Sequence, residues 1–190
     1  MISYSVFTYE FEPPVGLVTI VESGGAIRHV FFGDGNDRLY FSETGSRMFF
    51  GGDKTGAEKL GFWVDRKETG LLAEAAGQLG QYLEGARAAF DLPLNYMNPH
   101  SDITVTLFTD RALREVAAIP AGQTRSYGEV AAACGAPRAA RAVGSACAKN
   151  PIPYFIPCHR VIGQNGQLTG YAGGIEIKEH LLQLEQVYYA

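Results

Sequence analysis

The sequence predicts an α+β protein with an antiparallel sheet in its N-terminal half and mostly helices in its C-terminal half. Two observations predict this. Strand-forming residues alternate around a glycine turn within the first 32 residues, whereas apolar residues recur at helical spacing from about residue 71 onward. With 190 residues, 46% of them hydrophobic, the chain is long enough to bury a core in one large or two small domains.

The composition excludes several protein classes. Three cysteines, all beyond residue 130, do not form a disulfide framework and favour a reducing compartment. No zinc-binding spacing occurs, and neither a signal peptide nor an apolar run of about 20 residues is found. The sequence therefore predicts a cytoplasmic protein, nuclear if the source is eukaryotic, with no metal, no cofactor and no membrane association.

The N-terminal domain is predicted to span residues 1–98. Residues 2–11 form a strand, and residues 17–21 and 26–32 form a hairpin around Ser23, Gly24 and Gly25. One or two further strands are expected in residues 33–70, for which no function is apparent. Residues 71–86 form an amphipathic helix, residues 91–94 are extended, and residues 95–102 are a linker. The apolar face of that helix consists of Leu72, Ala75, Ala76, Leu79, Tyr82 and Leu83.

The C-terminal domain, residues 99–190, opens with a helix that presents Phe108, Ala112, Val116 and Ile119 on one face. Residues 126–134 form a short helix, Gly135 supplies a turn, and Pro137 begins a second helix over residues 137–148. Such a pair is a helix-turn-helix. A terminal helix over residues 176–188 carries an apolar stripe of Ile177, Leu181, Leu184 and Tyr188.

The second helix of the pair has very few long side chains. Ala139, Val143 and Ala146 are expected to pack inward, and Arg138, Arg141 and Ser145 lie on another face. The remaining positions are Ala140, Ala142 and Gly144. Reading bases in the major groove needs long polar side chains, so this helix cannot read sequence in that way. It is either a plain helical hairpin or a slim helix that enters the minor groove, where one arginine fills the gap left by an extruded nucleotide.

Charge and reactive groups concentrate in one part of the chain. The net charge is −4, yet the charged residues of positions 124–160 are Arg125, Arg138, Arg141, Lys149 and Arg160 against Glu129 alone. At the end of the same stretch, Pro151, Pro153 and Pro157 predict an extended apolar segment that leads into Cys158, His159 and Arg160. A cysteine can be simply a small buried residue, but an adjacent imidazole and guanidinium favour an activated nucleophile.

These motifs resemble a known family. Residues 157–162 (Pro-Cys-His-Arg-Val-Ile), with Asn150 and Pro151 before them and Gly170, Tyr171, Ala172, Gly173 and Gly174 after them, are similar to the active site of the O6-alkylguanine-DNA alkyltransferases. The resemblance covers residues 108–185. It implies a winged helix-turn-helix-like C-terminal domain and, by analogy, a ribonuclease-H-like N-terminal domain. The sequence departs from the residues usual in the family at Leu107, Thr109 and Ala172. It also lacks the zinc ligands that some relatives carry.

The resemblance also implies roles for single residues. Cys158 accepts the alkyl group, His159 takes the thiol proton through a bridging water, Asn150 positions the thiol, and Tyr127 donates a proton to the departing base. Arg141 intercalates, and Tyr127 crowds the phosphate of the target nucleotide. Val161, Tyr171, Ala172 and Gly173 line the pocket for the base. The predicted DNA-binding set is Arg138, Ala140, Arg141, Ala142, Gly144, Ser145, Tyr127 and Arg160.

The sequence adds two arguments of its own. Glu185 lies at the edge of the last apolar stripe, where a carboxylate could hold the His159 ring in one tautomer or simply face solvent. An S-alkyl thioether is a stable product, and the sequence shows no resolving cysteine, so each molecule would react once. The predicted protein is a monomeric, single-turnover alkyltransferase acting on double-stranded DNA that carries O6-alkylguanine, with O4-alkylthymine as a further candidate.

Three other functions remain open from sequence. A cysteine hydrolase using Cys158, His159 and Glu185 explains the nucleophile but predicts repeated turnover. A non-catalytic binder of alkylated bases would not need the reactive cysteine. A transcription regulator could use the helix pair, although the shortage of base-reading side chains argues against sequence specificity.

Overall fold

The computed structural model describes residues 3–33, 39–41, 48–50, 63–95 and 106–187. The chain divides into two compact units, one comprising Met1–Gln78 and Asp91–Thr104, the other Leu79–Phe90 and Val105–Ala190. Apart from Asn95, the predicted linker lies in residues 96–105, outside the described part of the chain, as does the boundary between residues 98 and 99. The boundary therefore stays a prediction.

The first unit is built on a four-stranded sheet with the order β3-β2-β1-β6. β1 (Ser3–Glu10), β2 (Leu17–Ser23) and β3 (Ala26–Phe32) are antiparallel, as the sequence predicts, whereas β6 (Trp63–Asp65) pairs parallel to β1. The β2–β3 turn is the predicted one, because Gly24 and Gly25 both have positive φ (62° and 73°), which L side chains adopt with difficulty. β4 (Leu39–Phe41) and β5 (Met48–Phe50) form a separate antiparallel pair.

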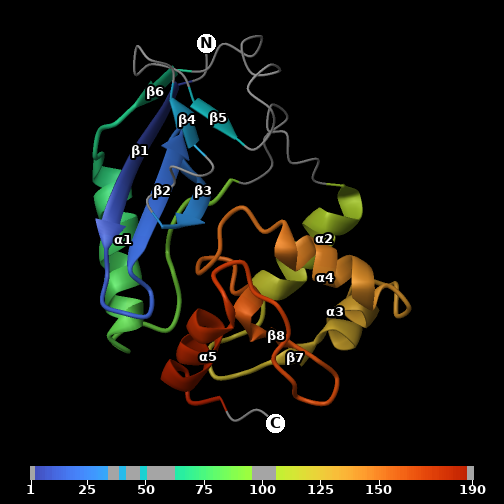
Figure 1. The fold of residues 1–190 in the computed structure, drawn as a ribbon. Coiled ribbons are helices and arrows are strands. Elements are labelled where there is room, and N and C mark those ends of the chain that lie inside the picture. The colour runs from blue at the N-terminus through green and yellow to red at the C-terminus, as the bar shows by residue number, and fades with distance from the viewer. Residues whose placement is uncertain (1–2, 34–38, 42–47, 51–62, 96–105, 188–190) are drawn as a thin grey trace. The chain divides into compact units, whose positions relative to one another are not determined.

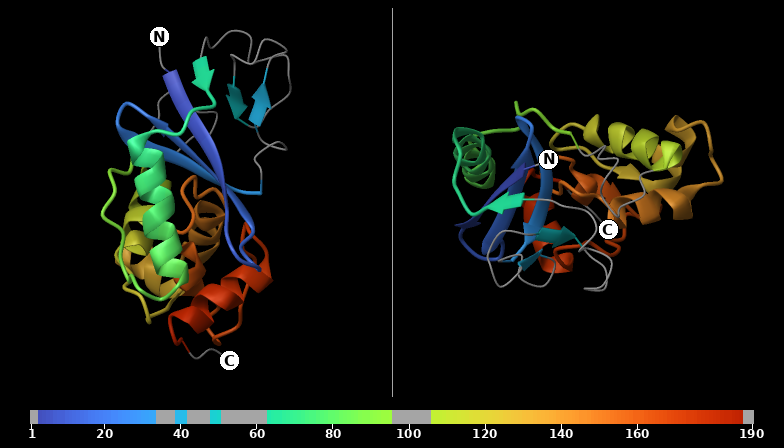
Figure 2. Two further views of the ribbon diagram at one scale, coloured as in Figure 1. Left: turned by 90° about the vertical axis from the view of Figure 1, so that its left-hand side faces the viewer. Right: turned by 90° about the horizontal axis from the view of Figure 1, so that it is seen from above.

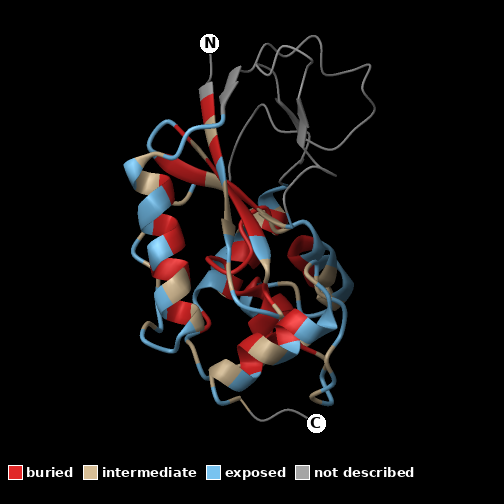
Figure 3. Ribbon diagram, turned by 60° about the vertical axis from the view of Figure 1, so that its left-hand side comes forward, coloured by how far each residue is buried: buried red, intermediate tan, exposed pale blue. Residues whose placement is uncertain are grey.

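Helix α1 (Gly70–Leu83) begins beside this sheet, and its apolar face is the predicted one. Its buried residues include Leu72, Ala75, Ala76, Leu79 and Tyr82, while the opposite side is exposed (Figure 3). Gly85 (φ 74°) ends the helix, where the Gly85 N–H bonds the Tyr82 carbonyl and the Ala86 N–H bonds the Gln81 carbonyl. Figures 1 and 2 show the first part of α1, which belongs to this unit, beside the strands of the sheet.

The second unit is mostly helical, in agreement with the predicted α+β fold. It contains α2 (Leu107–Ala117), α3 (Tyr127–Ala133), α4 (Ala140–Ala148) and α5 (Ile175–Leu184), with a 3-10 turn η2 (Cys158–Arg160). Two short strands, β7 (Arg125–Ser126) and β8 (Val161–Ile162), pair in parallel. Val130, Val143, Ile152, Val161 and Leu181 are among the fully buried residues of its core.

The helix pair α3–α4 has the predicted turn, but its second helix begins later than predicted. Gly135 (φ 71°) closes α3, whereas α4 begins at Ala140 instead of Pro137. The Ala139 N–H bonds the Ala136 carbonyl at 2.8 Å, so Pro137 occupies the second position of a β-turn, which its fixed φ suits equally well. Val143 and Ala146 pack inward as predicted, and Ala139 is half-buried.

The last helix is shorter than predicted and buries a different stripe. Ile177 and Leu181 are buried as expected, but Lys178 and Leu182 join them, and Leu184 is only half-buried. The helix ends at Leu184 because Gln186 adopts a positive φ of 59°, which directs the Val187 N–H back to the Leu182 carbonyl. Glu185 is thereby the C-cap residue, and Tyr188 lies outside the described residues.

Candidate active site

The β7–β8 pair brings two distant parts of the chain together. β7 runs directly into α3, whose first residue is Tyr127, and η2 runs directly into β8. Arg125 pairs with Val161 and Ser126 with Ile162. Ser126 also caps α3, since its hydroxyl accepts the Glu129 N–H while the Glu129 carboxylate accepts the Ser126 N–H at 2.7 Å. This short pairing places the start of α3 beside the Cys158–His159–Arg160 turn.

The segment before Cys158 is a buried loop and not the extended strand that the prolines predict. Asn150 closes it: its Oδ1 accepts the Ile152 N–H at 3.1 Å, and its Nδ2 donates to the Ile156 carbonyl at 2.8 Å. Tyr154 reverses the chain with a φ of 70°, an uncommon conformation for a residue other than glycine. The side chain of Asn150 therefore outweighs the extended preference of residues that precede proline.

The Cys158 thiol lies at the end of this loop and is 4% exposed. Asn150 Nδ2 donates to its Sγ at 3.3 Å. Burial raises the pKa of Cys158, and the Asn150 hydrogen bond and the positive charge of Lys178 oppose that shift. The thiol is therefore protonated at rest and needs a base to become nucleophilic. It is not remote from the helix pair, because the β7–β8 pairing places the start of α3 beside the turn that carries Cys158.

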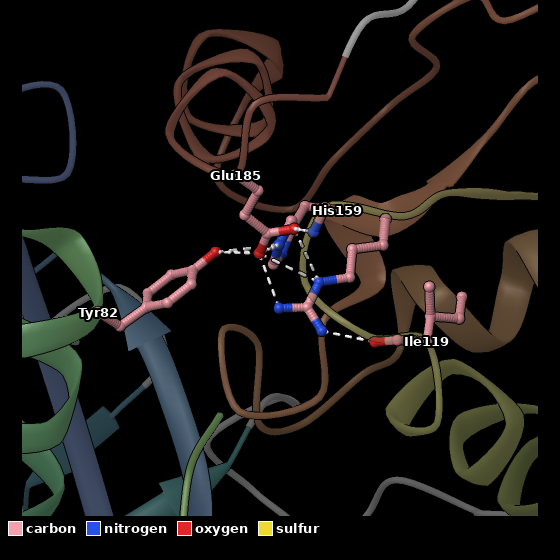
Figure 4. Close-up of polar contacts among 6 residues, drawn as sticks. Tyr82, Ile119, His159 and Glu185 are labelled. Atoms are coloured by element: carbon pink, nitrogen blue, oxygen red, sulfur yellow. Dashed lines mark hydrogen bonds and ion pairs between the residues drawn. The ribbon is translucent and has the colours of Figure 1, made fainter. Parts of the chain in front are cut away.

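The Glu185 carboxylate is a centre of hydrogen bonds (Figure 4). Arg160 donates from Nε and Nη2, the latter at 2.7 Å from Oε1, and the backbone N–H of Gly122 donates to Oε2 at 3.2 Å. Tyr82 and His159 also reach Oε1. Burial would raise the pKa of Glu185, but its hydrogen bonds with His159, Arg160 and Tyr82 outweigh burial and lower it to about 2.

His159 is fully buried, and its Nε2 lies 3.1 Å from Glu185 Oε1. An ionised carboxylate only accepts hydrogen bonds, so Nε2 carries the proton and Nδ1 is left as the basic nitrogen. Nδ1 has no hydrogen-bond partner among the described residues. Burial lowers the pKa of His159 more than Glu185 raises it, which keeps the imidazole neutral and able to accept a proton.

Two residues of this cluster were missed by the sequence analysis. Lys178 on α5 is fully buried, and its Nζ donates to the carbonyls of Val161 (2.6 Å) and Thr169 (3.3 Å). Tyr82 was assigned only to the apolar face of α1. The sequence contains a signal for each. Lys178 lies three residues before Leu181 and four before Leu182, the spacing of one helix face, and a buried tyrosine hydroxyl usually needs a partner.

Arg160 has another position than predicted. It was expected to contact DNA, but it is 5% exposed, its Nη1 donates to the Ile119 carbonyl at 2.6 Å, and its other donors hold Glu185. Because its hydrogen-bonding groups are used inside the protein, we assign Arg160 to the carboxylate cluster and not to a DNA-facing surface.

Tyr127 is half-buried and accepts a 2.9 Å hydrogen bond from the Thr169 hydroxyl. Gly144 of α4 lies against its ring: a Cβ atom at Gly144 would be 3.7 Å from Tyr127 Cε1. On the neighbouring surface, Arg138, Arg141, Ala142 and Ser145 are exposed and Ala140 is half-buried. Arg138 lies in the turn before α4, so the predicted arginine face is shared between turn and helix.

The residues predicted to line a pocket lie between β8 and α5. Val161 is fully buried, and the Tyr171 ring meets the His159 ring edge to face with centroids 6.4 Å apart. Ala172 is exposed and Gly173 is half-buried. The Gly174 N–H bonds the Tyr171 carbonyl at 3.0 Å, which folds this glycine-rich segment into a turn ahead of α5.

No metal site is apparent in the described ranges, which contain no group of three or more His, Cys, Asp or Glu side chains placed to hold an ion. Cys134, Cys147 and Cys158 are all free thiols. Among the helices that the structure describes, none has the length and apolar character required to cross a membrane.

Comparison with known proteins agrees with this geometry. Residues 107–187 match the family described as 6-O-methylguanine DNA methyltransferase, DNA binding domain. The constitutive methylated-DNA–protein-cysteine methyltransferase of Bacillus subtilis is 47% identical over 127 residues, which are 66% of this chain and 73% of that protein. The methylated-DNA–protein-cysteine methyltransferase of Methanosarcina acetivorans is 37% identical over 92% of this chain and 95% of its own length.

The fold of a solved relative is also similar. The crystal structure of Mycobacterium tuberculosis OGT in complex with DNA matches 97% of this chain and 92% of its own with a TM-score of 0.71 and 34% sequence identity. The sequence motifs, the Cys158 thiol held by Asn150 beside the His159–Glu185 pair, and these likenesses agree: the chain belongs to the family of the methylated-DNA–protein-cysteine methyltransferases.

Proposed function

We propose that this protein repairs DNA by moving the alkyl group of O6-alkylguanine to its own Cys158, once per molecule. The observation that carries the proposal is a buried thiol held by Asn150, adjacent in the chain to a neutral imidazole that Glu185 holds in one tautomer. The substrate is double-stranded DNA with the modified guanine turned out of the helix, as its reacting carbon is unreachable inside the stack.

The reaction balances with the residues present. The thiol proton passes through a bridging water to His159 Nδ1, and the Cys158 sulfur attacks the alkyl carbon, so an S–C bond forms as the C–O6 bond breaks. The electron pair of the broken bond goes to the guanine, which takes a proton from the Tyr127 hydroxyl. Burial raises the pKa of Tyr127, and the hydrogen bond that Thr169 donates to its oxygen opposes that shift and stabilises the phenolate that forms.

The exposed face around α4 is proposed as the DNA-binding surface. Arg141 would occupy the place of the extruded nucleotide, Arg138 and Ser145 would contact phosphates, and Ala140, Ala142 and Gly144 would let the helix approach the minor groove closely. Val161, Tyr171, Ala172 and Gly173 would form the walls of the base pocket.

The remaining proposals concern the setting of the reaction. The protein is proposed to act as a monomer with two domains, residues 1–98 and 99–190, in the cytoplasm, where its three free thiols stay reduced. O4-alkylthymine is proposed as a second substrate, since it too presents an alkyl group on an exocyclic oxygen.

The rival reaction is hydrolysis. A cysteine hydrolase forms a thioester that water cleaves, whereas an S-alkyl thioether has no comparable leaving group. The two functions therefore differ in turnover, and stoichiometry separates them.

The test uses duplex DNA with an O6-methylguanine labelled in its methyl group. We expect one label per chain, located on Cys158, and no further turnover with excess DNA. Cys158→Ala should abolish transfer and still bind DNA, and Cys134→Ala, which alters another buried free cysteine, should react normally. Label released into solution would indicate a hydrolase, and DNA binding without any transfer would indicate a non-catalytic binder.

A further inference from the structure

Tyr82 reaches the catalytic cluster from a helix outside the matched family domain. It lies in the last turn of α1, while the family match covers residues 107–187. Its hydroxyl lies 2.6 Å from Glu185 Oε1 and 3.2 Å from His159 Nε2 (Figure 4). The side chain is 2% exposed, so these contacts are made away from solvent.

The donor and acceptor roles of the three groups follow from their charges. The ionised Glu185 accepts, so the Tyr82 hydroxyl donates to Oε1, and its oxygen lone pairs remain available. The single proton on His159 Nε2 then meets two acceptors, Glu185 Oε1 at 3.1 Å and the Tyr82 oxygen at 3.2 Å. Both acceptors favour the tautomer in which Nδ1 is unprotonated.

We propose that Tyr82 is a positioning residue for alkyl transfer, whose hydroxyl fixes the His159 tautomer and orients the Glu185 carboxylate. The effect of Tyr82 on alkyl transfer rests on the proposed function, whereas its hydrogen bonds to His159 and Glu185 can be tested without the reaction. The active site is then incomplete without α1, although its nucleophile, base and carboxylate all lie in residues 158–185.

The ring of Tyr82 is held independently of its hydroxyl. It packs against Phe90 with ring centroids 5.3 Å apart, and Phe90 meets Phe155 edge to face at 4.8 Å. Tyr82→Phe should therefore keep the ring in place and remove only the hydrogen bonds. The substitution separates a positioning role from a packing role.

The charges around His159 set the direction of the pH effect. Glu185 raises the pKa of its imidazole, while burial, Arg160 and Lys178 lower it; Tyr82 and Tyr171 are the further titratable groups whose rings flank it, and Cys158 precedes it in the chain. Without the Tyr82 proton, more negative charge remains on Oε1, which favours imidazolium. The acid limb of the rate profile should then move to higher pH.

The experiment compares Tyr82→Phe with Tyr4→Phe, a tyrosine of similar burial in β1 of the other unit. The rate of methyl transfer from O6-methylguanine DNA is measured from pH 5 to 9, with DNA affinity alongside. We expect Tyr82→Phe to react roughly tenfold more slowly, the loss of about one hydrogen bond to a charged group, with unchanged DNA affinity and a shifted acid limb. Tyr4→Phe should match the wild type in all three.

A second measurement uses the full-length protein without DNA. The ¹⁵N chemical shifts of the His159 ring should show a protonated Nε2 and an unprotonated Nδ1 in the wild type, and a weaker preference in Tyr82→Phe. The proposal would be overturned if a folded Tyr82→Phe variant had the same ring chemical shifts, transfer rate and acid limb as the wild type. If the wild type itself transfers nothing, the proposed function fails, and the ring shifts still decide the role of Tyr82.

Discussion

The Glu185 cluster and the surface of α4 are built in opposite ways. Around Glu185, charged groups are removed from solvent and hydrogen-bonded by Arg160, His159, Tyr82 and the Gly122 N–H. On α4, the side chains are small or exposed, and Arg141 faces solvent. The reactive groups are therefore held in place in the absence of a ligand, whereas the proposed DNA-binding surface is exposed to solvent.

The largest effect is expected from Glu185→Ala. This change leaves the Arg160 guanidinium buried without its partner, and breaking a buried ion pair from one side costs about 3–5 kcal/mol. Chemical denaturation measures the loss. Glu129→Ala, which removes an exposed capping carboxylate from α3, should cost about 1 kcal/mol. Similar losses in the two variants would contradict the greater importance of the buried carboxylate.

The same carboxylate predicts the acid stability of the protein. Since the pKa of Glu185 falls to about 2 in the folded state, its contribution is fully present above the ordinary glutamate pKa and is lost as the pH falls toward 2. Unfolding free energy measured between pH 6 and 2 should therefore drop more steeply in the wild type than in Glu185→Ala. If the two curves of unfolding free energy against pH run parallel, Glu185 is not the source of the acid sensitivity.

Asn150→Ala should have an intermediate effect. It removes the hydrogen bond to Cys158 Sγ, which opposes the burial-raised thiol pKa, and it leaves the Ile156 carbonyl without that partner. We expect a loss of roughly 1–3 kcal/mol in stability and a methyl-transfer rate whose optimum moves to higher pH. Asn165→Ala, in an exposed turn, provides the control. An unchanged pH profile would show that Asn150 does not influence the pKa of the Cys158 thiol.

On the α4 surface, Arg141→Ala tests the proposed gap-filling role. Transfer from duplex DNA should slow roughly tenfold, because extruding a base costs a few kcal/mol that the arginine would help offset. Transfer from the free base O6-methylguanine, which needs no extrusion, should be unaffected. Arg114→Ala changes another exposed arginine and should leave both rates unchanged. Equal slowing on duplex and free base would contradict the role.

The smallest effect is expected from Gly144→Ala. A Cβ there would lie 3.7 and 3.9 Å from Tyr127 ring atoms, which is ordinary van der Waals contact. Alanine is the better helix former, so the variant should gain roughly 0.5–1 kcal/mol, visible as a higher melting temperature. A lower melting temperature would show that the Tyr127 ring needs more room than the structure gives it.

Local sequence signals predicted the parts of the fold that local forces control. The Gly24–Gly25 hairpin and the Gly135 turn were predicted correctly because positive φ angles select glycine. The start of α4 and the loop before Cys158 were predicted incorrectly. In both places proline permits more than one conformation. The Ala139–Ala136 backbone hydrogen bond decides between them before α4, and the side-chain hydrogen bonds of Asn150 do so before Cys158.

The site was predictable in its motif but not in its supporting contacts. Residue types indicated a thiol, a base and a carboxylate, while the burial of Arg160 and Lys178 and the approach of Tyr82 depend on tertiary packing. A basic residue in a motif looks the same whether it faces DNA or a buried carboxylate. Only the geometry distinguishes the two.

The most direct test of single-turnover transfer to Cys158 is the mass of the intact protein after reaction with excess O6-methylguanine duplex DNA. We expect one added methyl group per chain, mapped to the peptide that contains Cys158, with no further reaction. Unmodified protein together with continued loss of methyl groups from the DNA would contradict it.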